Sequence, residues 1–271
     1  MKKIVTVITS LTLLAALGGC KPSASGWKSY SGDKTIEQRV DSVLKLMTLE
    51  EKIGQMAQFS CNWDVTGPIM ADDFEPYLRK GLVGSIFNAY TVDGVRKLQE
   101  MALAESRLKI PVLFGYDVIH GFRTIFPMPL AEASSWDLEL MRKSAAIAAE
   151  EASAEGIHWT FAPMVDIARD ARWGRVMEGA GEDPYLGSLI AKARVEGFQG
   201  GKDWQSLQDL HTVLACCKHF AAYGAAESGR DYNNAELSLN TLMNYYMPPY
   251  KAAHEAGVAT YMASFNEIGG V

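Results

Sequence analysis

The chain has 271 residues, of which 48% are hydrophobic and 21% charged, a balance typical of a globular protein that can bury a sizeable core. The formal net charge is −6 and no cluster of Lys or Arg stands out. These features argue against nucleic acid as the main partner, because binding to phosphates needs a basic surface. A neutral or weakly charged substrate fits this composition better.

The first twenty residues are predicted to be an export signal and not part of the fold. Lys2 and Lys3 precede an apolar run that is shorter than the roughly 20 residues of a membrane-spanning helix. The small pair Gly18-Gly19 then stands directly before Cys20, which resembles a bacterial lipoprotein signal. This pattern predicts a lipid anchor at Cys20 and a place in the cell envelope, in the periplasm or at the outer membrane. The alternative is an ordinary signal peptide followed by a chance cysteine.

Residues 21–34 are rich in Ser, Gly and Lys and are predicted to form a flexible tether. From residue 35 to residue 271, patterns typical of helices and strands alternate. Helices are predicted at residues 36–47, 91–107, 138–155, 183–197 and 237–256. Strands are predicted at residues 55–59, 84–87, 111–116, 159–165, 213–220 and 259–265.

Strands that alternate with helices of this length indicate an α/β protein with a parallel sheet, either doubly wound or closed into a barrel. The dinucleotide fingerprint G-x-G-x-x-G is absent, and Glu182 and Asp183 follow the glycines Gly179 and Gly181, where they would repel a phosphate. We therefore expect residues 35–271 to form an incomplete (β/α)8 barrel of the TIM type, with about six of the eight strands present.

Three further cysteines, Cys61, Cys216 and Cys217, lie in the predicted folded part. Because neighbouring residues of a strand face opposite sides, we do not expect a disulfide between Cys216 and Cys217. No C-x-x-C or H-x-x-x-H spacing occurs, so the sequence gives no sign of a metal site, and we expect no cofactor.

Polar or unusual side chains stand where several of the predicted strands end. Asp117 follows the third strand, Arg175 lies in the long loop after the fourth, Lys218 and His219 end the fifth, and Met262 belongs to the sixth. In a (β/α)8 barrel the functional residues lie where strands run into the following loops. We therefore expect these side chains to meet at one end of the barrel.

Several motifs along the chain together resemble one enzyme family. They are Met47–Met56, Asp117 with His120-Gly121, Gly-Arg-x-x-Glu-Gly at residues 174–179, Lys218-His219-Phe220, and Ser264-Phe265-Asn266. In order and approximate spacing they are similar to the family 3 glycoside hydrolases of the β-glucosidase type, and the similarity runs from about residue 35 to the end. The resemblance implies that terminal non-reducing β-D-glucosyl residues are removed from oligosaccharides or glucosides by a retaining mechanism.

The resemblance also implies that the terminal sugar is bound by Asp117, Arg175, Lys218 and His219, with Met262 packed beside it. This assignment agrees with chemistry, because charged groups make stronger hydrogen bonds to hydroxyls than neutral groups do. For Lys218 and His219 both to face a sugar, the strand must depart from regular geometry, for example through a non-proline cis peptide.

Each residue also has a purely structural interpretation. Asp117 could cap a helix, and His219 could be a buried structural histidine. Arg175 and Glu178 could pair with each other and brace their loop. Asp166 is interpreted as a loop residue without a functional role.

The family resemblance also indicates what the sequence lacks. The fifth predicted strand continues as Phe220-Ala221-Ala222-Tyr223-Gly224, without the proline and second histidine of the hexosaminidase branch, which points to β-glucosidases and β-xylosidases. The nucleophilic aspartate that the family carries in a Ser-Asp-Trp or Ser-Asp-His context is missing. We therefore expect no catalytic residue here and a truncated, inactive part of a larger enzyme. The alternatives are a β-xylosidase and a lipid-anchored sugar-binding protein without catalysis.

Overall fold

The structure is a computed structural model that describes residues 34–61 and 73–271. The predicted export signal, Cys20 and the predicted tether up to residue 33 lie outside the described residues. In the described part of the chain, no helix is both long and apolar enough to cross a membrane. Cys61, Cys216 and Cys217 are buried, and no disulfide joins the neighbours Cys216 and Cys217.

Six strands lie at the centre of the part of the chain that the structure describes. They are β1 (Gln58–Ser60), β2 (Ser85–Phe87), β3 (Leu113–Tyr116), β4 (Trp159–Thr160), β5 (Cys216–Phe220) and β6 (Thr260–Ala263). Strands β1 to β4 pair in chain order, β5 pairs with β6, and every one of these ladders is parallel. Parallel bridges from Trp159 to Leu214 and from Met164 to Lys218 join the two sheets. Parallel strands in this order confirm the predicted α/β class.

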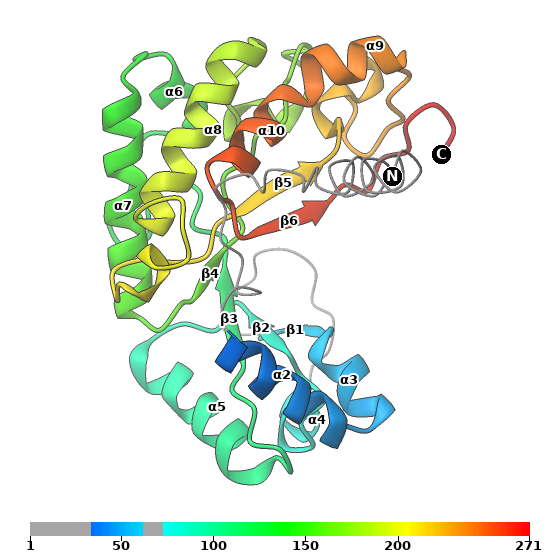
Figure 1. Cartoon of the computed structure of the whole chain (residues 1–271). Coiled ribbons are helices and arrows are strands. Elements are labelled where there is room, and N and C mark those ends of the chain that lie inside the picture. The colour runs from blue at the N-terminus through cyan, green and yellow to red at the C-terminus, as the bar shows by residue number, and fades with distance from the viewer. Residues whose placement is uncertain (1–33, 62–72) are drawn as a thin grey trace, which may run out of the picture.

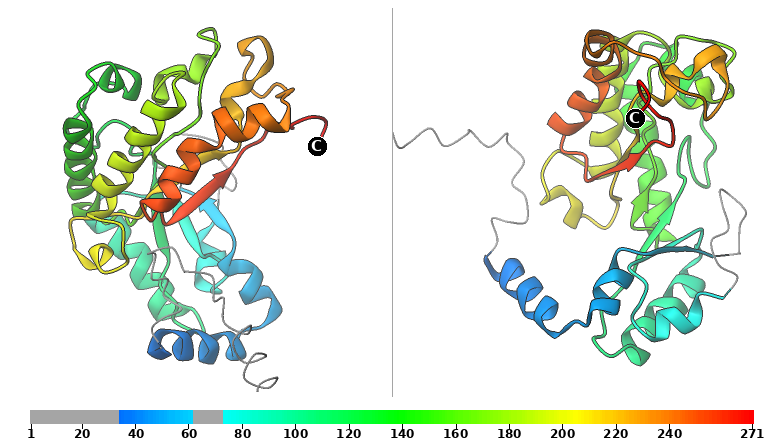
Figure 2. Two further views of the ribbon diagram at one scale, coloured as in Figure 1. Left: turned by 45° about the horizontal axis from the view of Figure 1, so that its top comes forward. Right: turned by 90° about the vertical axis from the view of Figure 1, so that its right-hand side faces the viewer.

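Nine helices of the described part connect or flank these strands. They are α2 (Lys34–Leu46), α3 (Leu49–Gln55), α4 (Glu75–Arg79), α5 (Val92–Glu105), α6 (Pro129–Ala133), α7 (Leu138–Ala154), α8 (Pro184–Gln199), α9 (Leu239–Thr241) and α10 (Pro248–Glu255). Helices α7, α8 and α10 run side by side along one flank of the strands (Figures 1 and 2). Helix α5 packs with Ile86 of β2 and Phe114 of β3 in a second core cluster.

Several predicted boundaries were wrong, each for a local reason. The strand predicted at 55–59 begins only at Gln58, because Thr48 starts α3 with a capping box and the helix continues to Gln55. The strand predicted at 159–165 keeps strand geometry over two residues only, and Pro163 beyond it has no N–H to donate. The helix predicted at 237–256 is interrupted by a π-helical turn at Leu242–Tyr246.

The main core lies between the flanking helices, β5 and the segment that follows β4, which contributes Ala162 and Val165. Buried alanines of α7, namely Ala145, Ala148, Ala149 and Ala152, leave room for α8 to approach closely. Gly197 of α8 is part of this contact, because a Cβ atom there would lie 2.4 Å from the Arg142 carbonyl oxygen. Close packing of α8 and α10 fixes the ends of the neighbouring strands, and those ends carry the predicted site residues.

Candidate functional site

Lys218 of β5 forms the centre of a cluster of charged side chains. Its Nζ lies 3.1 Å from Asp117 Oδ1, at the end of β3, and 3.9 Å from Glu178 Oε2. Only 4% of the Lys218 side chain is exposed. A buried ammonium needs charged partners, and the two carboxylates supply them from two different loops. The cluster therefore joins the ends of three strands that are far apart in sequence.

Arg175 and Glu178 form a bidentate pair inside the loop that follows β4. Arg175 Nε donates to Glu178 Oε1 at 2.7 Å, and Nη2 donates to Oε2 at 2.8 Å. Burial alone would raise the pKa of Glu178, but the hydrogen bonds from Arg175 and the charge of Lys218 hold it below its ordinary value. Burial alone would likewise lower the pKa of Arg175, and Glu178 more than offsets this. Both groups therefore stay charged at neutral pH.

His219 is fixed by Asp166. The Nδ1 atom of His219 lies 2.8 Å from Asp166 Oδ2, and the His219 backbone N–H donates to the same oxygen at 2.9 Å. Tyr250 donates to Asp166 Oδ1 at 2.8 Å, so both carboxylate oxygens are occupied. Burial lowers the pKa of His219, although Asp166 opposes this. A neutral ring that donates from Nδ1 presents Nε2 as an acceptor. Asp166, interpreted from the sequence as a loop residue, orients this histidine.

Tyr223 links Arg175 to His219. The guanidinium carbon of Arg175 lies 5.4 Å from the centre of the Tyr223 ring, and the His219 ring meets the same ring edge-on at 4.9 Å. The Tyr223 hydroxyl donates to Asp231 Oδ1 at 2.5 Å, and the indole N–H of Trp173 donates to that oxygen at 2.9 Å. This aromatic support was missed in the sequence, because no pattern there connects Trp173, Tyr223 and Asp231.

Met262 of β6 stands opposite Lys218 in the parallel ladder and is half-buried. Residues in register on parallel strands point to the same face of a sheet, so the thioether lies on the Lys218 side. The bond between Lys218 and His219 is cis, and the register shifts between Lys218 and Phe220, so β5 departs from regular geometry as expected. The structure thus brings Asp117, Arg175, Lys218 and His219 into one connected cluster with Met262 beside it.

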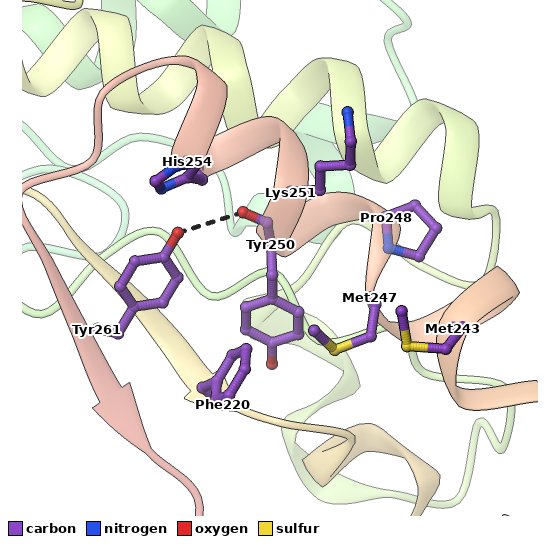
Figure 3. Close-up of a pocket in the computed structure, with 8 residues that line it drawn as sticks. All are labelled: Phe220, Met243, Met247, Pro248, Tyr250, Lys251, His254 and Tyr261. Carbon is purple, nitrogen blue, oxygen red and sulfur yellow. Dashed lines mark hydrogen bonds between the residues drawn. The ribbon is translucent and has the colours of Figure 1, made fainter. Parts of the chain in front are cut away.

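An apolar cavity of ≈ 570 Å³ lies on the α10 side of β5 and β6 (Figure 3). It is lined by Phe220, Met243, Met247, Pro248, Tyr250, Lys251, His254 and Tyr261. The lining contains no carboxylate and none of the five predicted site residues. In residues 34–61 and 73–271, no group of His, Cys, Asp and Glu side chains is arranged to hold a metal ion.

Comparisons with known proteins agree on one family. The sequence model of the glycosyl hydrolase family 3 N terminal domain matches residues 48–271. A periplasmic β-glucosidase from Salmonella typhimurium is 44% identical over 231 residues, which cover 85% of this chain and 29% of that protein. A putative β-xylosidase from Formosa agariphila is 32% identical and is aligned with the whole chain and 38% of its own length. The chain therefore spans about a third of the length of these relatives.

A solved structure of similar fold is the β-glucosidase from Listeria innocua in complex with isofagomine. It superimposes with a TM-score of 0.79 at 42% identity and covers 87% of this chain and 33% of its own. An exo-1,3/1,4-β-glucanase variant from Pseudoalteromonas reaches a TM-score of 0.77 at 29% identity and covers 88% of this chain and 40% of its own. These matches confirm the predicted fold, a TIM-type α/β barrel.

Proposed function

The chain belongs to glycosyl hydrolase family 3, and we propose that the whole protein removes terminal non-reducing β-D-glucosyl residues from oligosaccharides or glucosides by a retaining mechanism. The observation that carries this proposal is the charged cluster around Lys218, which joins Asp117, Glu178 and Arg175 at the ends of neighbouring strands. Solved relatives of similar fold include β-glucosidase complexes with glucose and with laminaribiose, which supports the same substrate class.

We propose that Asp117, Arg175, Lys218 and His219 bind the hydroxyls of the terminal sugar, with Met262 packed beside it. Asp117 has one oxygen on Lys218, and its side chain is 28% exposed, so it can accept from sugar hydroxyls. His219 offers Nε2 as an acceptor once Nδ1 is bound to Asp166. A site that satisfies several hydroxyls at once rejects analogues that lack one of them.

The covalent chemistry is proposed to require groups other than these. A retaining glycosidase needs two carboxyl groups about 5–5.5 Å apart, one as nucleophile and one as acid/base. Both oxygens of Glu178 are bound to Arg175, and both oxygens of Asp166 are bound to His219 and Tyr250. A lowered pKa also keeps Glu178 from donating a proton at neutral pH. We therefore assign nucleophilic attack to neither Glu178 nor Asp166, and we assign sugar binding to Asp117.

Hydrolysis of aryl glycosides tests the proposed activity. We expect the protein expressed from its complete gene to hydrolyse an aryl β-glucoside faster than an aryl β-xyloside, and Asp117→Asn to abolish this activity. Faster cleavage of the xyloside would favour the β-xylosidase function named for the Formosa relative. Absence of any glycosidase activity in the complete protein would favour a sugar-binding protein without catalysis.

We also propose that the protein acts in the periplasm and is anchored to a membrane through lipid on Cys20. The Salmonella relative is named as periplasmic, and Gly18-Gly19-Cys20 follows a short apolar run. Expressed in a Gram-negative host, the wild-type protein should sediment with membranes, and Cys20→Ser should release it or block its processing. Identical fractionation of the two proteins would exclude the anchor.

A further inference from the structure

The loop that follows β5 packs closely against the loop that carries Arg175. Gly229 has a φ of 65°, and a Cβ atom there would lie 2.8 Å from the backbone nitrogen of Trp173. A Cβ atom on Gly224 would lie 2.3 Å from the carbonyl oxygen of Ile167. Only glycine allows such a close approach at these two positions. The two loops therefore form one packed unit, in which a residue of the first loop can fix a residue of the second.

Asp231 joins the two loops through hydrogen bonds. Its Oδ1 accepts from the indole N–H of Trp173 at 2.9 Å and from the hydroxyl of Tyr223 at 2.5 Å. Both rings are buried, so both donors hold fixed positions. Burial alone would raise the pKa of Asp231, but the hydrogen bonds from Tyr223 and Trp173 hold it below its ordinary value. Asp231 is therefore a charged acceptor at neutral pH.

Tyr223 connects Asp231 to two residues of the charged cluster. The guanidinium carbon of Arg175 lies 5.4 Å from the centre of the Tyr223 ring, and the His219 ring meets that ring edge-on at 4.9 Å. Burial and the bond to Asp231 raise the pKa of Tyr223, so its hydroxyl keeps its proton at neutral pH. A phenol that donates to a carboxylate gains electron density in its ring, and an electron-rich ring attracts a cation more strongly. Asp231 therefore both orients Tyr223 and strengthens its attraction for Arg175.

We propose that Asp231 is a positioning residue for the terminal sugar, which acts through Tyr223 and fixes the guanidinium of Arg175 where it donates to a sugar hydroxyl. This inference rests on the proposed function, because it requires Arg175 to bind the sugar. Glu178 accepts from Nε and Nη2 of Arg175, which leaves Nη1 to donate to the sugar. Glu178 and Tyr223 thus fix the guanidinium together, and Asp231 determines the contribution of Tyr223.

Calorimetric titration of the complete protein with glucose and with its monodeoxy analogues tests the proposal. We expect Asp231→Ala and Tyr223→Phe each to weaken glucose binding by about three- to tenfold. The analogue that the wild-type protein and Arg175→Lys bind equally well lacks the hydroxyl that Arg175 binds. Asp231→Ala and Tyr223→Phe should bind this same analogue as the wild-type protein does, within about twofold.

A double variant tests whether Asp231 acts through Tyr223. Asp231→Ala added to Tyr223→Phe should weaken glucose binding by less than a further factor of about two, because the bond between the two residues is already lost. Two controls should bind glucose as the wild-type protein does. Tyr246→Phe removes the hydroxyl of another buried tyrosine, in the π-helical turn. Asp203→Ala removes a carboxylate that accepts from the Ser206 N–H in the loop after α8.

Three results would overturn the proposal. The first is unchanged glucose affinity in Asp231→Ala and Tyr223→Phe. The second is an equal loss of affinity for glucose and for every deoxy analogue, which would mean that Asp231 only stabilises the fold. The third is additive losses in the double variant, which would mean that Asp231 does not act through Tyr223. Failure of the proposed function gives a different result, because the wild-type protein would then bind neither glucose nor its analogues.

Discussion

Lys218 and Asp117 are 101 residues apart in the sequence, and Lys218 Nζ lies 3.1 Å from Asp117 Oδ1. The contact joins the end of β5 to the end of β3. It depends on the parallel pairing of β3 with β4 and on the bridges that join β4 and the segment after it to β5 and the segment before it. Because the Lys218 side chain is almost fully buried, we expect Lys218 and Asp117 to interact more strongly than the solvent-exposed ion pairs of the helices do.

The first prediction concerns the strength of this pair. In a double-mutant cycle of Asp117→Asn and Lys218→Met, we expect a coupling of about 1–3 kcal/mol in the free energy of unfolding, measured by urea denaturation. The exposed pair of Lys251 and Glu255 on α10 is the matched control. Lys251→Met and Glu255→Gln should couple by only about 0.3–0.5 kcal/mol. Equal coupling in the two cycles would contradict the burial argument.

The second prediction separates geometry from charge at Arg175. Arg175→Lys keeps the positive charge but loses the fork that binds both oxygens of Glu178 and lies over Tyr223. We expect glucose affinity to fall by about tenfold in calorimetric titration, the loss of one charge-assisted hydrogen bond. Arg142→Lys on α7 is the control, because Arg142 binds Glu139 with the same fork on the surface. If glucose affinity falls by the same small factor in both variants, a positive charge at position 175 is sufficient for glucose binding.

The third prediction concerns pH. Burial holds the pKa of His219 below its ordinary value of 6.5, and the pKa of His158 is lowered for the same reason. The unfolded chain therefore takes up protons near pH 6.5 that the folded protein does not yet bind. Stability should be highest above pH 6.5 and should decline as the pH falls below it. In urea denaturation at several pH values, the free energy of unfolding of His219→Gln should depend less steeply on pH than that of the wild-type protein. An equally steep dependence would show that His219 does not cause it.

The fourth prediction tests a buried ion pair behind the cluster. Arg194 of α8 donates from Nη1 to Glu132 of α6 at 2.7 Å and from Nη2 to the carbonyl oxygen of Ile119, two residues after Asp117. Arg194→Met should lower the free energy of unfolding by about 3–5 kcal/mol, because it leaves the Glu132 charge buried and unpaired. The double variant Arg194→Met, Glu132→Leu should regain most of this loss. A double variant less stable than Arg194→Met would contradict this explanation.

The sequence was sufficient to predict the alternation of strands and helices and the strand ends at which Asp117, Lys218 and Met262 stand. Those predictions use periodicity, which depends on neighbours along the chain. Three other features depend on contacts between distant segments and could not be predicted in this way. They are the role of Asp166 under His219, the support of Arg175 by Tyr223, and the hydrogen bonds of Trp173 and Tyr223 to Asp231.

Element boundaries were hardest to predict where the backbone departs from regular geometry. Pro163 interrupts the run after β4, and the π-helical turn at Leu242–Tyr246 interrupts the helix before α10. In both places the side-chain pattern continues while the pattern of backbone hydrogen bonds changes. A pattern of apolar residues therefore located the segments but not their ends.

The central claim is that the cluster around Lys218 binds the terminal sugar of a β-glucoside, and titration with glucose tests it most directly. We expect the wild-type protein to bind one glucose, and Asp117→Asn and Lys218→Met each to weaken binding by more than about tenfold, because each removes a charge-assisted hydrogen bond. Circular dichroism of both variants should show that they remain folded. Wild-type binding that persists unchanged in both folded variants would contradict the claim.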